Sequence, residues 1–116
     1  MQLEGRDLTR LRDIEIYASR ALDYLNQAGG QTSGTLVQDA ILRCFDVIGE
    51  AARAASPAVR TAYPAIPWPF MIGMRNRVIH EYHRVDHALV SKTVRDDLPG
   101  LIAQVRAILA AQGSAP

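Results

Sequence analysis

Apolar residues recur every three or four positions along much of this chain, which is the period of an amphipathic α-helix. One such stripe covers residues 7–25, and Gly29 and Gly30 follow it, as is typical where a helix ends. A second, wider stripe covers residues 35–55 and predicts a helix buried against more than one neighbour. Gly49 lies inside this second helix, where the usual reason for a glycine is the close approach of another helix.

A short helix and a longer one are expected next. Ser56 followed by Pro57 matches an N-cap with proline at the first helical position, and predicts a helical turn through about residue 63. The proline-rich stretch 64–69 interrupts the chain, and its prolines can open a helix because the first helical amides need no partner. The core positions predicted for this fourth helix are Phe70, Met74 and Val78.

Two further helices complete the pattern. Asp86 is placed to cap one of them, and Asp97 with Pro99 begins the last. The residues predicted to point inward are Leu89, Val90, Val94, Leu101, Ile102, Val105, Ile108 and Leu109. No segment alternates apolar and polar residues as a strand would, so the predicted fold class is all-α, a bundle of four to six helices. We expect one domain over residues 1–111 and a flexible tail over 112–116.

Composition narrows the class of protein. A chain of 116 residues with 48% hydrophobic and 22% charged residues is expected to form one globular domain. The formal net charge is only +1, so any site for a polyanion must be local. Cys44 is the only cysteine, which excludes an intrachain disulfide scaffold. With no signal-peptide pattern and no apolar run long enough for a membrane span, a cytoplasmic location is expected.

The candidate chemistry is concentrated in residues 75–87, which hold all three histidines and three of the arginines. Asn76, His80, His83 and His87 follow one another at intervals of four, three and four residues. They would therefore share one face if the helix continued that far.

Arg75 and His80 are five residues apart, roughly 140° around an ideal helix. Their head groups converge only if the arginine curls round, the helix unwinds, or a second chain contributes, so a site shared across a dimer is expected. A histidine can move a proton to or from ribose and leaving-group oxygens, and a guanidinium can bind the phosphate. Asn76 can orient either partner. These groups suit RNA cleavage without a metal.

Two other interpretations of the same residues stay open at this point. An arginine and a histidine on an exposed helix are often simply solvated surface. Histidines at helical spacing can also bind zinc or nickel, although no cysteine or well-placed carboxylate completes a set with His80, His83 and His87. A zincin protease is excluded, because Arg84 stands where that motif needs its second histidine.

Two separated motifs resemble a known family. The stretch Ile66-Pro67-Trp68 through Met71-Ile72-Gly73-Met74-Arg75-Asn76-Arg77-Val78-Ile79-His80-Glu81-Tyr82 closely resembles HepT-like proteins, formerly the DUF86 family, of the HEPN superfamily. Ile48-Gly49-Glu50-Ala51-Ala52 resembles the family's other recurrent signature, on the preceding long helix. The likeness in helix order and length extends over nearly the whole chain. Pro69 and His83 depart from the family pattern without touching the proposed catalytic pair.

The resemblance implies an endoribonuclease toxin with an Arg-x4-His-x-Tyr motif, formed here by Arg75, His80 and Tyr82. It implies cleavage of RNA with no metal or other cofactor, by a homodimer whose two motifs lie near each other, and Asn76 matches the polar residue after the arginine. It also implies a partner, a minimal nucleotidyltransferase antitoxin that silences the toxin by transferring AMP to the motif tyrosine, here Tyr82. Each added phosphodiester would compete for Arg75 and repel RNA.

Two alternatives to a nuclease stay open at this point. In one, the chain is a non-catalytic module that binds a nucleotide or docks the nucleotidyltransferase; in the other, it is a bare dimerisation domain. Trp68 is expected to be a core or dimer anchor, and Gly49 and Glu50 are expected to be structural.

Overall fold

A computed structural model describes residues 2–30 and 34–113, and within these ranges it contains six α-helices, one short 3-10 helix and no strand. The elements are, in chain order, α1 (Gly5–Gln27), α2 (Thr35–Ala54), α3 (Pro57–Ala62), α4 (Trp68–His80), η1 (Tyr82–Arg84), α5 (His87–Asp96) and α6 (Leu98–Gly113). The predicted all-helical class and helix number are confirmed. No helix in the described ranges has the length and apolar character needed to cross a membrane.

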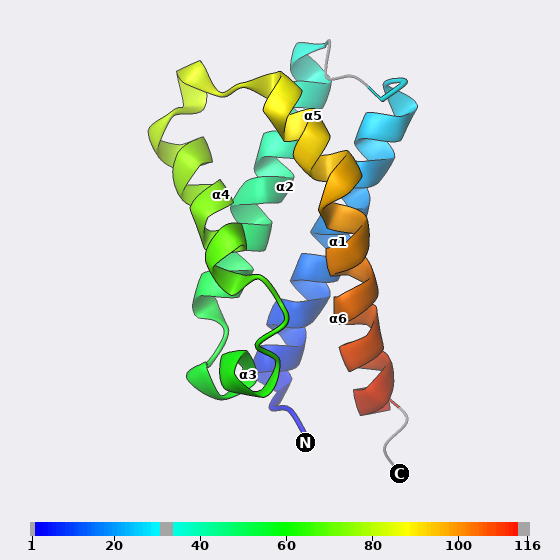
Figure 1. Ribbon diagram of the computed structural model, residues 1–116, viewed down its shortest axis with the longest axis vertical. Coiled ribbons are helices and arrows are strands. Elements are labelled where there is room, and N and C mark those ends of the chain that lie inside the picture. The colour runs from blue at the N-terminus through cyan, green and yellow to red at the C-terminus, as the bar shows by residue number, and fades with distance from the viewer. Residues whose placement is uncertain (1, 31–33, 114–116) are drawn as a thin grey trace.

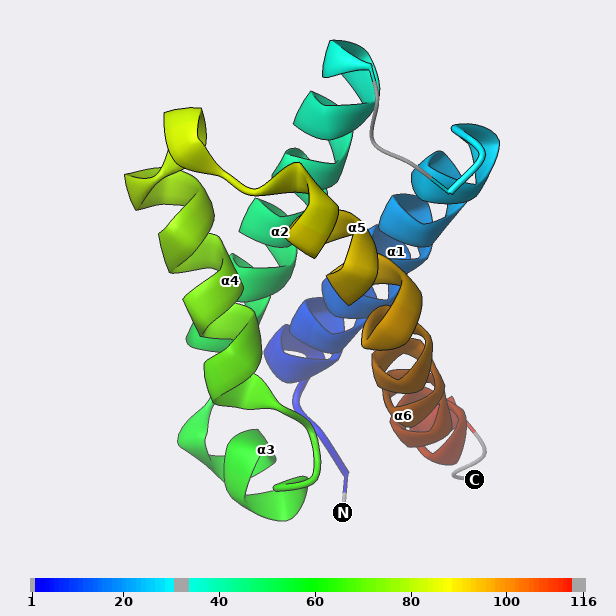
Figure 2. The same ribbon diagram turned by 45° about the horizontal axis from the view of Figure 1, so that its top comes forward.

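The long helices form an elongated bundle of 46 × 27 × 20 Å (Figure 1). α2 packs between α1 and α4, and α1 in turn packs between α2 and α6. The two ends of the bundle differ, as Figures 1 and 2 both show: α3 and the two chain ends lie at one, and η1 with the start of α5 lies at the other. The contacts of α2 with both α1 and α4 confirm that its wide apolar face packs against two neighbouring helices.

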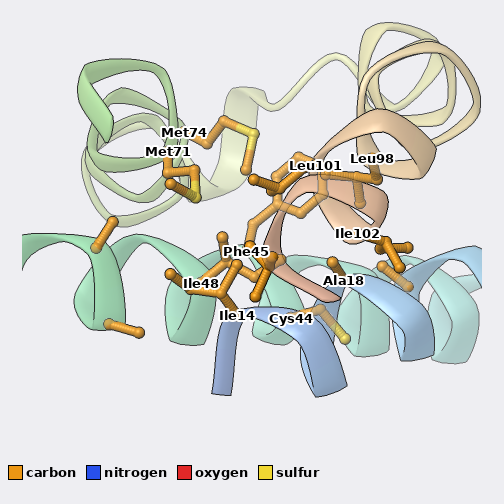
Figure 3. Close-up of a cluster of buried hydrophobic side chains, with 14 of the residues drawn as sticks. Ile14, Ala18, Cys44, Phe45, Ile48, Met71, Met74, Leu98, Leu101 and Ile102 are labelled. Carbon is orange, nitrogen blue, oxygen red and sulfur yellow. The ribbon is translucent and has the colours of Figure 1, made fainter. Parts of the chain in front are cut away.

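The core runs along the bundle between the helices. In Figure 3, side chains of α2 meet those of α4 on one side and those of α1 and α6 on the other. The labelled buried residues are Ile14, Ala18, Cys44, Phe45, Ile48, Met71, Met74, Leu98, Leu101 and Ile102. Burial raises the pKa of the Cys44 thiol to about 11, so this cysteine is a core residue and not a thiolate nucleophile.

The ends of the first three helices follow from their sequences. Gly29 and Gly30 have positive φ, and their amides donate to the last carbonyls of α1, in the arrangement that glycine favours after a helix. Ser56 caps α3 by accepting a hydrogen bond from the Val59 amide, as predicted. The same serine donates twice to the buried Asp7 carboxylate, from its backbone N at 3.0 Å and from its Oγ at 2.6 Å. These bonds join the start of α1 to the α2–α3 connection.

The start of α4 differs from the prediction in one respect. Trp68 is buried, and its Nε1 donates to the Tyr63 carbonyl at 3.1 Å, as expected for a core anchor. Met71, Met74 and Val78 form the buried stripe, whereas Phe70 is 41% exposed. The prediction of Phe70 as a core residue is therefore wrong. The buried row that starts at Trp68 continues three residues later, at Met71, and this places Phe70 on another side of the helix.

In α5 the predicted cap is present, but one residue predicted to point inward does not. Asp86 caps α5 as predicted, by accepting from the amides of Ala88 and Leu89. The Leu89 side chain, however, is 48% exposed and does not point inward; Ser91 is buried instead.

The last helix, α6, reaches the end of the described residues. α6 continues to Gly113, past the predicted domain end at residue 111, and Gln112 Oε1 accepts a hydrogen bond from the Leu3 amide at 2.9 Å. Residues 114–116 of the predicted tail lie outside the described residues.

Candidate functional site

The three histidines do not share one helix face. α4 ends at His80, and the chain leaves the helix at Glu81, which has φ −123° and ψ 27°. His83 lies in η1 and His87 begins α5. The condition for one face shared by Asn76 and the three histidines, a helix that continues past His80, is therefore not met.

The placement of these histidines bears on the metal-site interpretation. Among residues 2–30 and 34–113, no group of three or more His, Cys, Asp or Glu side chains is arranged to hold a metal ion. The interpretation of the histidines as a metal centre thus gains no support from their positions.

Arg75 lies in the middle of α4 and faces α2. Its Nε is 3.2 Å from Asp46 Oδ1 and 3.3 Å from Glu50 Oε2, and the side chain is 25% exposed. Neither contact has the alignment of a hydrogen bond, and Nε is buried without a hydrogen-bond partner among the described residues. The guanidinium is thus held electrostatically by two carboxylates, and its Nε forms no hydrogen bond with either of them.

Gly49 explains how Arg75 comes so close to α2. A Cβ at residue 49 would lie 2.1 Å from the Cβ of Arg75 and 2.7 Å from the carbonyl oxygen of Met71. Any side chain here would push α4 away from α2, which confirms the close helix approach expected at this glycine.

A shallow pocket of about 220 Å³ opens over the Arg75 side chain. Asp46 and Glu50 line it together with Arg10 and Arg43. Charges of both signs therefore surround the guanidinium, and the pocket brings residues of α1, α2 and α4 to one place.

The other proposed catalytic residues lie apart from this pocket. Asn76 is exposed on α4, and His80 is exposed at its last residue. In the described part of the chain no hydrogen bond or ion pair joins His80 to Arg75, and His80 does not line the Arg75 pocket. A single chain therefore fixes Arg75 but leaves His80 facing solvent.

Tyr82 connects η1 to the other long helix of the site. Its hydroxyl donates a hydrogen bond to Asp39 Oδ1 at 3.1 Å, while the side chain remains 47% exposed. The hydrogen bond to the Asp39 carboxylate, and the negative charge of that group, raise the pKa of Tyr82 above its ordinary value. The ring also makes an edge contact with His83, with 5.5 Å between the centroids.

The acidic partners of this site were not predicted from the sequence. Asp39, Asp46 and Glu50 follow one another on α2 at intervals of seven and four residues, so they share one face of that helix. This spacing was a signal that could have been used. Glu50, expected to be structural, contacts both Arg53 and Arg75; its hydrogen bond to Arg53 lowers the pKa of the carboxyl group, and the Arg75 charge adds to that effect.

A second and larger cleft, of about 460 Å³, lies between α4 and α5. Phe70 and Leu89 line it with Met74 and Val85, and Arg77 and Arg84 contribute charge. The exposure of Phe70 and Leu89 is thus explained by their position on the wall of an open groove.

Comparison with known proteins identifies the family. Residues 9–108 match the family described as ribonuclease HepT-like. The chain therefore belongs to the HepT-like ribonuclease family, and the resemblance inferred from the two motifs is confirmed. No solved structure matches the chain significantly.

Similar proteins carry ribonuclease names. Two proteins of Methanocaldococcus jannaschii are each named "Putative RNase". One is 29% identical over 107 residues, covering 84% of this chain and 88% of that protein. The other is 34% identical over 73 residues, covering 63% and 67%. "Probable ribonuclease HepT" of Thermococcus cleftensis is 39% identical over 64 residues, covering 55% of this chain and 58% of that protein.

Proposed function

We propose that this protein is a metal-independent endoribonuclease toxin that works as a homodimer and is silenced by a nucleotidyltransferase antitoxin. Family membership supports the ribonuclease assignment. The observation that carries the site is the contrast within α4: Arg75 is held against α2 by two carboxylates that form no hydrogen bond with its Nε, and His80 is exposed five residues further along.

In the proposed reaction, the ribose 2′-oxygen attacks the adjacent phosphorus, and the bond from phosphorus to the 5′-oxygen breaks. His80 removes the proton from the 2′-hydroxyl or gives one to the leaving 5′-oxygen. Arg75 binds the phosphate oxygens, where negative charge grows in the transition state, and Asn76 orients the phosphate or the imidazole. The products are a 2′,3′-cyclic phosphate and a 5′-hydroxyl.

The homodimer is proposed because one chain leaves the two principal groups apart. Arg75 faces α2, and His80 is exposed at the end of α4. A two-fold symmetric pair of chains can bring His80 of one near Arg75 of the other, and that arrangement needs no distortion of either helix.

Cleavage of RNA by the purified protein in EDTA tests the nuclease directly. We expect His80→Ala to slow cleavage about 1000-fold. His83→Ala is the matched control, because His83 is also exposed and only three residues away, and it should cleave at the wild-type rate. Equal cleavage by wild type and His80→Ala would show the assignment to be wrong.

The silencing step predicts a covalent change at Tyr82. The phenolic oxygen attacks the α-phosphorus of ATP, pyrophosphate leaves, and the phenolic proton is released. Tyr82 suits this role because its hydroxyl is on a half-exposed side chain in η1, the turn after α4. After co-expression with a nucleotidyltransferase, intact mass should increase by whole AMP units, and Tyr82→Phe should abolish the increase while Tyr24→Phe should not.

A non-catalytic module that binds nucleotide or docks the nucleotidyltransferase is the second candidate. It is favoured by the two carboxylates beside Arg75, which weaken the local attraction for a polyanion. Expression of the chain alone separates the two: a nuclease arrests growth in a manner that depends on Arg75 and His80, and a binding module does not.

A further inference from the structure

Five charged side chains form a connected network along α2, with Arg75 of α4 at its centre. Arg43 Nη1 lies 2.9 Å from Asp46 Oδ2, and Arg53 Nε donates to Glu50 Oε2 at 3.0 Å. Arg75 Nε lies between the two acids, at 3.2 and 3.3 Å. We call these five residues, Arg43, Asp46, Glu50, Arg53 and Arg75, the α2 charge network.

Neutralising the two acids does not require Arg75. Each carboxylate already pairs with an arginine three residues away on its own helix. An arginine placed only to complete an ion pair would normally form aligned, often two-pronged hydrogen bonds with a carboxylate. Arg75 Nε forms no such bond with Asp46 or Glu50. We therefore infer that these contacts place the guanidinium and do not serve mainly to complete an ion pair.

Both the first side-chain carbons of Arg75 and its guanidinium lie against α2. Gly49 lets the first carbons of the side chain lie directly against α2. Asp46 lies three residues before Gly49 and Glu50 directly after it, and both carboxylates lie near Nε of the guanidinium. The head group lies at the wall of the Arg75 pocket.

We propose that Asp46 and Glu50 are positioning residues, which fix the orientation of the Arg75 guanidinium so that it can receive the RNA phosphate. This inference rests on the proposed nuclease function. Binding of a phosphate would break no aligned hydrogen bond of Arg75, because none exists with the two acids. The network holds three cations against two anions and therefore stays attractive to RNA.

Neutral variants of the two acids test the proposal by kinetics on a short defined RNA. We expect Asp46→Asn with Glu50→Gln to lower kcat about 100-fold, with a much smaller change in KM, because a misplaced group costs transition-state binding most. Each single variant should have an intermediate effect. Asp46→Glu keeps the charge and should keep most of the activity.

Glu15→Gln is the matched control, since it removes an acid that pairs with an arginine elsewhere in the bundle, Arg106, at 3.2 Å. It should leave kcat unchanged. A double variant that folds and cleaves at the wild-type rate would overturn the proposal, and so would one that cleaves faster, because the acids would then be competitors of the phosphate.

A second measurement separates this proposal from the nuclease itself. In ¹⁵N-labelled protein, the buried Arg75 Nε–H should give a slowly exchanging resonance, assigned by its loss in Arg75→Lys. We expect that resonance to shift and exchange rapidly when both acids are neutral, and to persist in Glu15→Gln. An unchanged resonance in the double variant would overturn the positioning role even if RNA is cleaved. A protein with the expected resonances but no cleavage would refute the proposed function alone.

Discussion

Arg75 and His80 belong to the same helix, but their surroundings have little in common. Arg75 is packed on Gly49, held by two carboxylates and mostly buried. His80 is exposed at the last residue of α4, next to a short 3-10 turn and an extended connection to α5. Arg75 belongs to the tightly packed α2–α4 contact. His80 lies at the end of the bundle that carries η1 and the start of α5.

This contrast bears on the proposed site, which one chain would not complete. The charge that must be oriented is fixed by tertiary packing, which a chain of this size can supply by itself. His80, the proposed proton-transfer group, is exposed, so a second chain or a substrate can reach it. The predictions that follow test whether Arg75 is held by packing within one chain and whether His80 is left exposed for a second chain or a substrate.

The largest expected effect concerns complementation between inactive variants. Arg75→Ala and His80→Ala should each slow cleavage about 1000-fold. If the site combines Arg75 of one chain with His80 of the other, mixing the two variants should restore roughly a quarter of the wild-type rate, because half of the dimers are mixed and each has one intact site. Rates measured before and after subunit exchange check this. No recovery in proven mixed dimers would place both residues in the same chain's site.

The next largest effect concerns the α2–α4 contact. Gly49→Ala should destabilise the fold by about 3 kcal/mol, because the new Cβ would lie 2.1 Å from that of Arg75 and the helices must separate. Gly73→Ala on α4 is the control: nothing lies within 4 Å of its Cβ, and the replacement should add about 0.5–1 kcal/mol of stability. Urea unfolding of both variants gives the two values. Similar stabilities would mean that the contact is looser than described.

A smaller effect distinguishes two neighbours at the end of α4. Val78 is 8% exposed and Ile79 is 47% exposed. Val78→Ala should cost about 2 kcal/mol, whereas Ile79→Ala should change the free energy of unfolding by less than about 0.5 kcal/mol. Unfolding measured at several protein concentrations adds information. A large loss of unfolding free energy in Ile79→Ala that depends on protein concentration would show that a second chain covers the end of α4.

The smallest effect is a shift in the titration of Tyr82. Its pKa is raised by the hydrogen bond to Asp39, so Asp39→Asn should lower that pKa toward the ordinary tyrosine value. Where Asp39 is ionised, the interaction stabilises the fold below the ordinary tyrosine pKa, and its contribution is lost as pH rises through the raised value. Tyrosinate absorbance against pH, with Tyr82→Phe to identify the signal, measures the shift. An identical curve for Asp39→Asn would mean that the bond is absent in solution.

Much of the fold could be predicted because caps and apolar spacing agree. Ser56, Asp86 and the pair Gly29-Gly30 each mark a helix end with side-chain or backbone chemistry that acts locally. The errors at Phe70 and Leu89 have a common cause. Both residues line the groove between α4 and α5, and local spacing does not reveal whether a neighbouring helix covers a given face.

The site was harder to predict than the fold. The motif residues could be named from spacing and resemblance, but the break at Glu81 depends on how η1 and α5 connect. The partners of Arg75 and Tyr82 come from α2, roughly 25 to 45 residues earlier, and such contacts are set by helix packing. Only the shared face of Asp39, Asp46 and Glu50 on α2 offered a clue.

The hydrogen bond between Tyr82 and Asp39 also works as a tether, because it fastens the turn after α4 to the first half of α2. A group transferred to the tyrosine oxygen would remove the proton that makes the bond and would set a phosphodiester charge facing the Asp39 carboxylate. Like charges at that distance repel, so the modified turn would be pushed away from α2. The transferred group would then have two effects: it would occupy the surface near His80, and it would release the turn that contains Tyr82 from α2.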